Sequence, residues 1–167
     1  ENGPSINLVD DSARWQYASL DFPDSENSIT VDELGLTFFL TINLPQATAR
    51  MMTYDHISKS IVQITTLSQA DFVNTSATSS RCGMFYFDGS IYFVPQVPFS
   101  RKVIEITISD YAQYTTTIPG TGTFKGASLD LSRSKIYVCN YNNAGSVNSI
   151  VSVDVSTHAI SLPYTEL

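Results

Sequence analysis

Basic residues are scarce in this chain of 167 residues: nine are Lys or Arg against 16 Asp or Glu, a net charge of −7. Binding to nucleic acid requires Lys and Arg side chains gathered against the phosphates. The one adjacent basic pair is Arg101-Lys102, and we expect it to protect the start of a strand rather than to bind an anion. The sequence therefore predicts no nucleic-acid partner.

Long apolar runs and cysteines are also lacking. No apolar run approaches the roughly 20 residues that span a bilayer, and no signal segment is recognisable at the N-terminus. Cys82 and Cys139 are too few for a disulfide scaffold or a zinc site. We expect both to be buried thiols acting as small apolar side chains, and a single bridge between them stays open. The chain begins at Glu1 rather than Met, so a processed protein and a piece of a longer one both stay open.

Motifs that carry catalysis are missing too. The sequence contains no nucleophile elbow, no HExxH and no phosphate loop, and its acidic residues do not follow EF-hand spacing. The two histidines, His56 and His158, fall in polar turns, where we interpret them as solvated. We expect no catalytic residue, no metal, no cofactor and no enzymatic activity.

The residues that are abundant favour strands. Charged residues make up 15% of the chain where about 25% is typical, and Thr, Ser, Val, Ile, Tyr and Phe take their place. No segment keeps a period of 3.6 residues, so helices should be few and short. The composition predicts an all-β protein that is long enough for one sizeable core.

A three-strand pattern recurs three times with a period of about fifty residues. Phe38, Tyr92 and Tyr137 occupy the same place in the three copies. The copies are Leu36–Leu40, Arg50–Asp55 and Ser60–Thr65; Ser90–Val94, Lys102–Thr107 and Tyr114–Ile118; and Lys135–Cys139, Ser149–Asp154 and Ala159–Leu162. A further strand precedes each copy, at 29–31, 84–87 and 128–131, so each repeat should hold four strands joined as hairpins.

The turns of the repeats have patterns of their own. Asp55 and Asp154 both open an Asp-x-x-Ser/Thr-x-x-Ile turn, in which the carboxylate can accept backbone N–H bonds. The middle copy keeps the length of this turn but has Thr107 in the leading place. Asp88-Gly89 is a strong two-residue hairpin signal.

With these features the repeats resemble the blades of β-propellers. The segment 88–94 is similar to the second strand of blades in the kelch, NHL and YVTN-like superfamilies, and the turns at Asp55 and Asp154 resemble those between the third and fourth strands of PQQ- and YVTN-type blades. The resemblance implies three four-stranded blades, half a propeller, over about 28–70, 82–120 and 126–167. Residues 1–27 would form an N-terminal arm with a latch strand at 15–22.

The resemblance implies a fold without a specific activity. The sequence has no Trp-Asp dipeptide, no paired kelch glycines and no sialidase Asp box, so family chemistry has no residue to attach to. A β-sandwich or barrel of the same strands remains the alternative architecture.

Three blades cannot close a ring, because propellers have about four to eight. If each end sheet presents on the order of 400 Å² of apolar surface, leaving both exposed forfeits roughly 20 kcal/mol, more than the usual net stability of about 5–15 kcal/mol. We therefore expect protein partners through the blade faces: a head-to-tail homo-oligomer, or further blades of a longer polypeptide.

Two segments are candidates for contact with sugars. Tyr141, Asn142 and Asn143 combine an aromatic ring with amides, which suits a glycan ligand, and Asn74 begins an N-glycosylation sequon. The sequence favours a non-enzymatic binding or structural module that is extracellular or on a particle surface. A fragment of a propeller enzyme, a hydrolase or lyase, and a lectin-like module are the alternatives.

Overall fold

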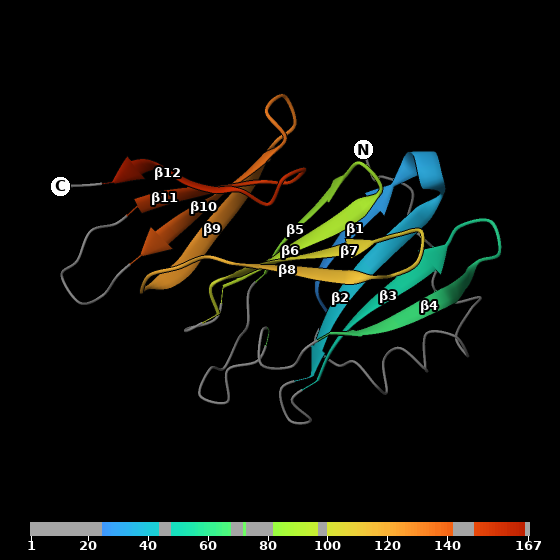
Figure 1. Cartoon of the computed structure of the whole chain (residues 1–167). Coiled ribbons are helices and arrows are strands. Elements are labelled where there is room, and N and C mark those ends of the chain that lie inside the picture. Colours follow the sequence, from blue (N-terminus) through green and yellow to red (C-terminus); the bar gives the residue numbers. More distant parts are fainter. Residues whose placement is uncertain are drawn as a thin grey trace, which may run out of the picture.

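The structure is a computed structural model that describes residues 25–43, 48–67, 72, 82–96, 100–141 and 149–165. These residues form three four-stranded antiparallel sheets (Figure 1). The predicted latch strand and arm, apart from residues 25–27, lie outside the described residues. Within the described part, no helix is long and apolar enough to cross a membrane.

Each sheet is one blade, and its strands follow chain order from one edge to the other. Blade 1 contains β1 (Ser25–Val31), β2 (Leu36–Asn43), β3 (Thr48–Asp55) and β4 (Ser60–Leu67), with the 3-10 helix η2 (Asp32–Leu34) between β1 and β2. Blade 2 contains β5 (Cys82–Phe87), β6 (Ser90–Pro95), β7 (Lys102–Thr107) and β8 (Gln113–Thr117). Blade 3 contains β9 (Thr123–Asp130), β10 (Lys135–Tyr141), β11 (Ser149–Asp154) and β12 (Ile160–Thr165).

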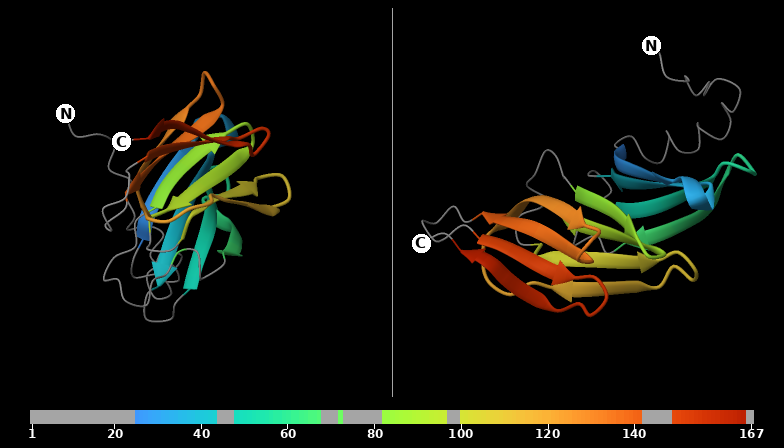
Figure 2. Two further views of the ribbon diagram at one scale, coloured as in Figure 1. Left: turned by 60° about the vertical axis from the view of Figure 1, so that its left-hand side comes forward. Right: turned by 90° about the horizontal axis from the view of Figure 1, so that it is seen from above.

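The first strands of the blades bring the three sheets together. β1 contacts β5, and β5 in turn contacts β9, while β4, β8 and β12 form the opposite edges of their sheets. The blades thus lie side by side in chain order around the side where their first strands meet (Figures 1 and 2). This arrangement confirms three blades of a partial β-propeller and excludes a two-sheet sandwich.

Alternating side chains bury both faces of blade 2. We call the side of a blade that faces the next blade along the chain its forward face, and the other side its backward face. On β6, Ile91 and Phe93 project backward into the core shared with blade 1, and Tyr92 and Val94 project forward into the core shared with blade 3. All six residues of β6 are buried. Successive side chains of a strand point to opposite faces, so the consecutive apolar residues 91–94 produce a strand that is covered on both sides.

The two cores are made in the same way. The forward face of blade 1, with Phe38, Leu40 and Met51, packs on the backward face of blade 2, with Phe93 and Ile104. The forward face of blade 2 packs equally on a backward face of blade 3, which carries Ala127, Ile136, Val138, Val151 and Val153. Small residues allow close approach beside the first strands: a Cβ added to Gly83 of β5 would lie 3.3 Å from the Cβ of Ala127 of β9.

One backbone motif recurs at the same end of all three blades. The residue before the second strand is left-handed, with φ of 62° at Gly35, 77° at Gly89 and 51° at Ser134. Its carbonyl accepts a hydrogen bond of 2.9 Å from the backbone N–H of His56, Ile108 and Val155, respectively. Gly adopts this conformation without steric cost, so Gly35 and Gly89 suit the turn, and Ser134 shows that a small L-residue is accommodated there.

Carboxylates cap the turns between the third and fourth strands. Asp154 Oδ1 accepts hydrogen bonds from the backbone N–H groups of Ser156 (3.1 Å) and Thr157 (2.9 Å), and Asp55 Oδ1 accepts one from Ile57 N–H at 2.7 Å. In blade 2 the missing leading carboxylate is replaced from within the turn, because Asp110 Oδ1 accepts bonds from Thr107 Oγ1 and from the N–H of Ala112. These bonds to the ionised form lower the pKa of all three aspartates.

Truncation of Phe93 should expose the dependence of the fold on the core between blades 1 and 2. Phe93 is fully buried and meets Phe72 edge-on with ring centroids 5.8 Å apart. We expect Phe93→Ala to lower the free energy of unfolding by about 3–5 kcal/mol, measured by urea denaturation. The control Leu131→Ala removes a side chain that is 67% exposed and should change it by less than about 0.5 kcal/mol. Equal effects would contradict the packing described above.

The capped turns predict loss of stability in acid. The folded-state pKa of Asp154 lies below the ordinary value of 3.8. The stability that the ionised Asp154 contributes to the folded state is therefore present above pH 3.8 and is lost as the pH falls through the folded-state pKa. Asp154→Ala should lower the melting temperature at pH 7 and weaken its decline between pH 5 and pH 2, as followed by circular dichroism. Ser156→Ala, which keeps the backbone donor, should retain the wild-type pH profile.

Candidate functional site

The forward face of blade 3, hereafter the blade 3 face, has no described element packed on it. One row across this face runs from Ser128 of β9 through Tyr137 and Ser152 to Ser161 of β12. The next row contains Gly126, Cys139 and Ile150. The opposite faces of these strands fill the core with blade 2. The blade 3 face is therefore the surface on which a following blade would lie.

Exposure along this face differs from that at the matching positions of blade 2. Tyr92 and Val94 are 4% and 0% exposed beneath blade 3. Their counterparts Tyr137 and Cys139 are half-buried and exposed. The prediction of a buried thiol is thus correct for Cys82 and wrong for Cys139, because the strand pattern reveals an apolar position but not whether a further sheet covers it. No disulfide joins Cys82 to Cys139 in the structure.

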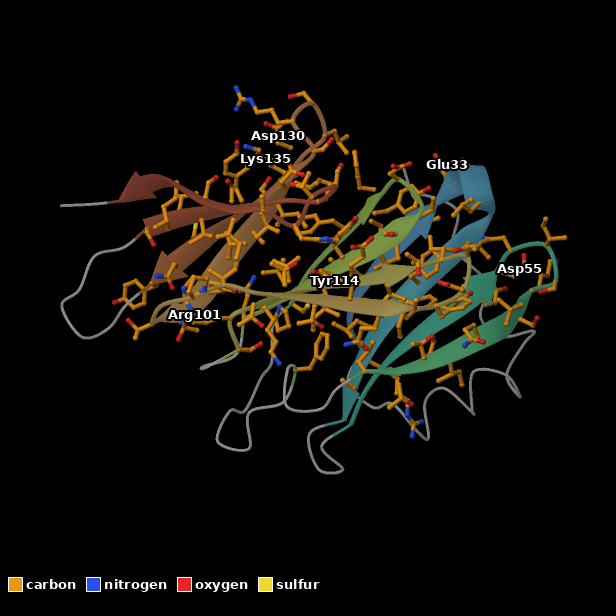
Figure 3. The ribbon with its side chains drawn as sticks, viewed as in Figure 1. Glu33, Asp55, Arg101, Tyr114, Asp130 and Lys135 are labelled. Atoms are coloured by element: carbon orange, nitrogen blue, oxygen red, sulfur yellow. The ribbon has the colours of Figure 1, made fainter. Side chains whose placement is uncertain are left out.

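Cationic groups lie along the margins of the blade 3 face. Lys125 Nζ lies 5.8 Å from the ring centroid of Tyr141. Arg133 forms a hydrogen bond to Tyr137, which raises the pKa of the guanidinium group, and its Nη1 lies 3.6 Å from Asp130 Oδ2. Lys135 stands at the start of β10, near Asp130 (Figure 3). The face thus combines hydroxyl groups and moderately apolar side chains with a charged margin, in which Asp130 and Asp154 lie beside Lys135 on the neighbouring strands.

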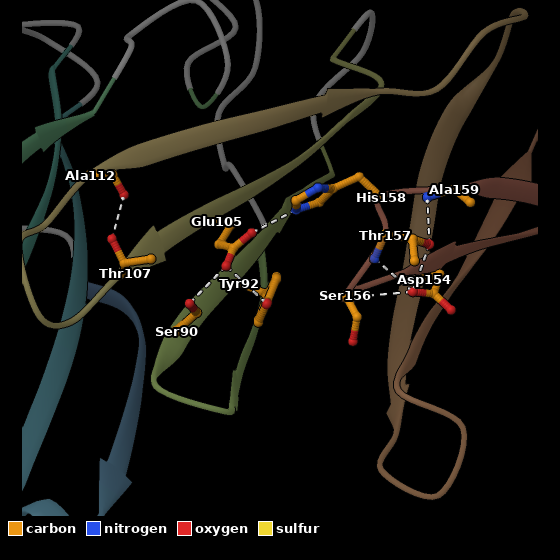
Figure 4. Close-up of polar contacts among 10 residues, drawn as sticks. All are labelled: Ser90, Tyr92, Glu105, Thr107, Ala112, Asp154, Ser156, Thr157, His158 and Ala159. Atoms are coloured by element: carbon orange, nitrogen blue, oxygen red, sulfur yellow. Dashed lines mark hydrogen bonds and ion pairs between the residues drawn. The ribbon is translucent and has the colours of Figure 1, made fainter.

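A polar network joins blades 2 and 3 and illustrates how one blade docks on another (Figure 4). His158, in the turn before β12, places Nε2 2.8 Å from Glu105 Oε2 of β7 and stacks on Tyr114 with ring centroids 4.0 Å apart. Glu105 Oε1 accepts hydrogen bonds from Ser90 Oγ (2.8 Å) and Tyr92 OH (3.1 Å). Burial, and then the neighbouring Glu105 carboxylate, raise the pKa of Tyr92.

His158 is therefore an inter-blade contact, and its interpretation as a solvated turn residue is wrong. Its position recurs: Lys59, Tyr111 and His158 are left-handed residues with φ of 52°, 56° and 57° in the same turn of the three blades. Tyr111 packs against the core with blade 1, as His158 reaches back to blade 2. The alignment of the three turns contained this signal, but Glu105 lies 53 residues from His158 and local patterns do not reveal such pairs.

Arg101 forms hydrogen bonds mainly with backbone carbonyl groups, as expected for a structural role rather than for anion binding. Its guanidinium group donates to the carbonyls of Ile118, Pro119 and Thr121 and to Asn140 Oδ1, at 2.6 to 3.2 Å. Burial lowers the pKa of the guanidinium group, which lies over the ring of Phe124 at 5.2 Å. Figure 3 places Arg101 at the end of the blades opposite to Asp130. The side chain thus holds the crossover from β8 to β9.

The remaining candidate residues from the sequence lie partly within and partly outside the described residues. Tyr141 ends β10 and is 43% exposed; Asn142, Asn143 and Asn74 lie outside the described residues, so the glycan hypotheses stay predictions. His56 is exposed and forms a 2.7 Å hydrogen bond to Thr37 Oγ1. Among the described residues, no three His, Cys, Asp or Glu side chains converge as metal ligands would.

Comparisons with known proteins identify the architecture. No protein-family model matches the chain, and no curated protein matches it in sequence. A chain of the crystal structure of a nidogen/laminin complex, which is of propeller type, is similar in fold with a TM-score of 0.51 and 10% identity. The match covers 80% of the present chain and 45% of the other, so this chain spans less than half the length of that propeller chain. At this identity the likeness concerns the fold alone.

The contact between Glu105 and His158 should couple the two residues energetically. In a double-mutant cycle of Glu105→Gln and His158→Ala, we expect a coupling energy of about 0.5–3 kcal/mol, because both groups are partly buried and belong to one network. Urea denaturation measures the four free energies. The pair Asp130 and Arg133, which is longer at 3.6 Å and has a guanidinium group on a side chain that is 69% exposed, is the control and should show no measurable coupling. Additive effects at Glu105 and His158 would contradict the network.

Proposed function

We propose that this chain is a non-enzymatic binding and assembly module whose blade 3 face binds another polypeptide. The observation that carries the proposal is the exposure of Cys139 at a position where Val94, its counterpart in blade 2, is fully covered. Both internal examples of a forward face in this chain, those of blades 1 and 2, are covered by a following sheet. A propeller blade buries both of its faces against neighbours, and the blade 3 face lacks one.

The composition of the blade 3 face suits a protein ligand. Tyr137 and Ile150 supply apolar area, while Ser128 and Ser161 supply hydroxyl groups that can pair with a partner's polar groups. Interfaces between separately folded units typically mix apolar centres with polar margins, and aromatic residues are enriched in them. Lys125, which is exposed at the margin, favours a partner with acidic or carbonyl groups at its periphery.

As part of the same proposal, the module acts outside the cell or on a particle surface. The sparse charge, the abundance of Thr and Ser and the sequon at Asn74 support this location. The nidogen/laminin neighbour is a complex of proteins, which is compatible with a protein partner here. The proposal requires no cofactor and no metal.

Thiol protection tests whether the blade 3 face is occupied in the native setting. Material from the natural source, treated with iodoacetamide before any denaturant is added, should show Cys139 modified at least tenfold more slowly than in the denatured chain. Peptide mass spectrometry reads both cysteines in one experiment. Cys82, buried at 9% exposure, is the internal control and should be protected in every folded sample.

The rate at which Cys139 is modified distinguishes an occupied blade 3 face from an uncovered one. Slow modification of Cys139 in native material indicates that a partner covers the blade 3 face, provided that the folded chain reacts fast once dilution has separated it from its partners. If Cys139 in native material reacts as fast as in the isolated folded chain, the blade 3 face is not a binding surface and the proposed function is wrong.

A further inference from the structure

We infer that the outer edge of β4 (Ser60–Leu67) pairs antiparallel with the β4 edge of a second copy of this chain. The two four-stranded blade 1 sheets then join into one continuous sheet. This edge is separate from the blade 3 face and from both broad faces of blade 1, because the second copy lies beside the sheet and not on top of it. The open backbone groups of β4, its lack of protection and its match with itself point to this contact.

The outer side of β4 offers backbone groups for a further strand. β4 is the last strand of its sheet, and among the described strands it pairs with β3 alone. Figure 1 shows it at the edge of blade 1 opposite to β1. In an antiparallel strand about every second residue directs its N–H and C=O groups away from its one neighbour. Such groups bind an extended strand through main-chain hydrogen bonds.

The outer strands of the other two blades have features that discourage such pairing. β12 has a proline at position 163, which lacks a backbone N–H, and its pairing with β11 shifts register between Ile150 and Ser152. β8 has five residues only, and His158 of blade 3 stacks on Tyr114 there. Short strands, prolines and irregular pairing are common protections of a sheet edge.

β4 is longer and less protected. It has eight residues, Ser-Ile-Val-Gln-Ile-Thr-Thr-Leu, with no charged residue and no proline. A register shift opposite Thr53 affects the beginning of the strand, so residues 63–67 are its regular part. Val62 and Ile64 are 50% and 38% exposed at this edge. Uncharged segments rich in Val, Ile and Thr are those that pair most readily with another strand.

A second copy is the occupant that suits this edge. The chain has a net charge of −7, so two copies approach each other most easily where no charged side chain stands, and β4 is such a place. A foreign strand selected by its charge would find no opposite charge on β4 to recognise. The pairing also continues the antiparallel ladder that already joins β1 to β4.

Symmetry makes β4 complementary to itself. A two-fold axis perpendicular to the sheet relates two identical antiparallel strands, so the same segment supplies both halves of the contact. Opposed residues then project to the same face of the joined sheet. When the regular parts pair, the two Ile64 side chains lie opposite or diagonal to each other, within reach of one another. Apolar side chains at a half-exposed edge thereby cover each other.

The assembly ends at two copies. The two-fold contact uses the β4 edges of both chains at once, and the other edge strand of blade 1, β1, lies against β5. Blade 3 lies at the other end of the described arc (Figure 1). A pair of chains would therefore present two blade 3 faces, one from each copy.

Light scattering coupled to size-exclusion chromatography tests the inference on the purified full chain. We expect a mass of twice 18.4 kDa at micromolar concentration. Ile64→Lys should return the mass to that of a single chain, because it places like charges together across the pair. The control Leu131→Lys, at a turn residue of blade 3 that is 67% exposed, should leave the mass doubled.

A charge swap separates a β4 contact from a loss of folding. Ile64→Glu should also give single chains, but an equal mixture of Ile64→Lys and Ile64→Glu should recover the doubled mass, because opposite charges then meet. Native mass spectrometry identifies the mixed pair, since the two variants differ in mass. Circular dichroism confirms that each variant is folded.

Three outcomes would overturn the inference. A wild-type mass of 18.4 kDa at every concentration excludes the pair. A doubled mass that Ile64→Lys leaves unchanged shows that the copies associate through another surface. A mixture of the two charged variants that stays single shows that the β4 edges do not meet. None of these results bears on the blade 3 face, which the protection of Cys139 tests separately.

Discussion

Packing of sheet on sheet is the interaction on which this structure depends. No backbone hydrogen bonds join the blades in the described sheets, so side chains alone hold one blade to the next. β6 shows the requirement in its strictest form, because every residue from Ser90 to Pro95 is buried. An antiparallel sheet that must be covered on both faces needs a neighbour on each side. The stability of blade 2 and the incompleteness of blade 3 are consequences of the same rule.

Much of the fold was predictable from the sequence, because strands and hairpin turns produce recognisable patterns within short segments. The period-two pattern around Phe38, Tyr92 and Tyr137, and the Asp-Gly turn before β6, fix strands and hairpins over short distances. The repeat then supplies the architecture, since a sheet that recurs three times must stack on itself. The substitution of Asp110 for the leading carboxylate in blade 2 was not predictable, because the turn tolerates a cap from either of two places.

The candidate site was harder to predict, and Cys139 and His158 show why. Apolar alternation identifies Cys139 as a position for a covered side chain, but only the arrangement of sheets shows that no described strand covers it. His158 looked like an ordinary turn residue until its left-handed backbone placed it against Glu105, far away in sequence. Pairs that form between repeats leave no local pattern, so a sequence reveals the repeats more readily than what joins them.

The small residues where the first strands meet have a geometric consequence. Gly83 and Ala127 let β5 and β9 approach closely, and the distance between neighbouring inner strands determines how wide a wedge each blade occupies. A full circle holds more blades when each blade occupies a narrow wedge than when each occupies a broad one. The size of a few side chains on the inner strands therefore influences how many blades complete a ring. The outer strands can vary in sequence without changing that number. Substitutions on the inner strands alone could thus change the symmetry of a related propeller.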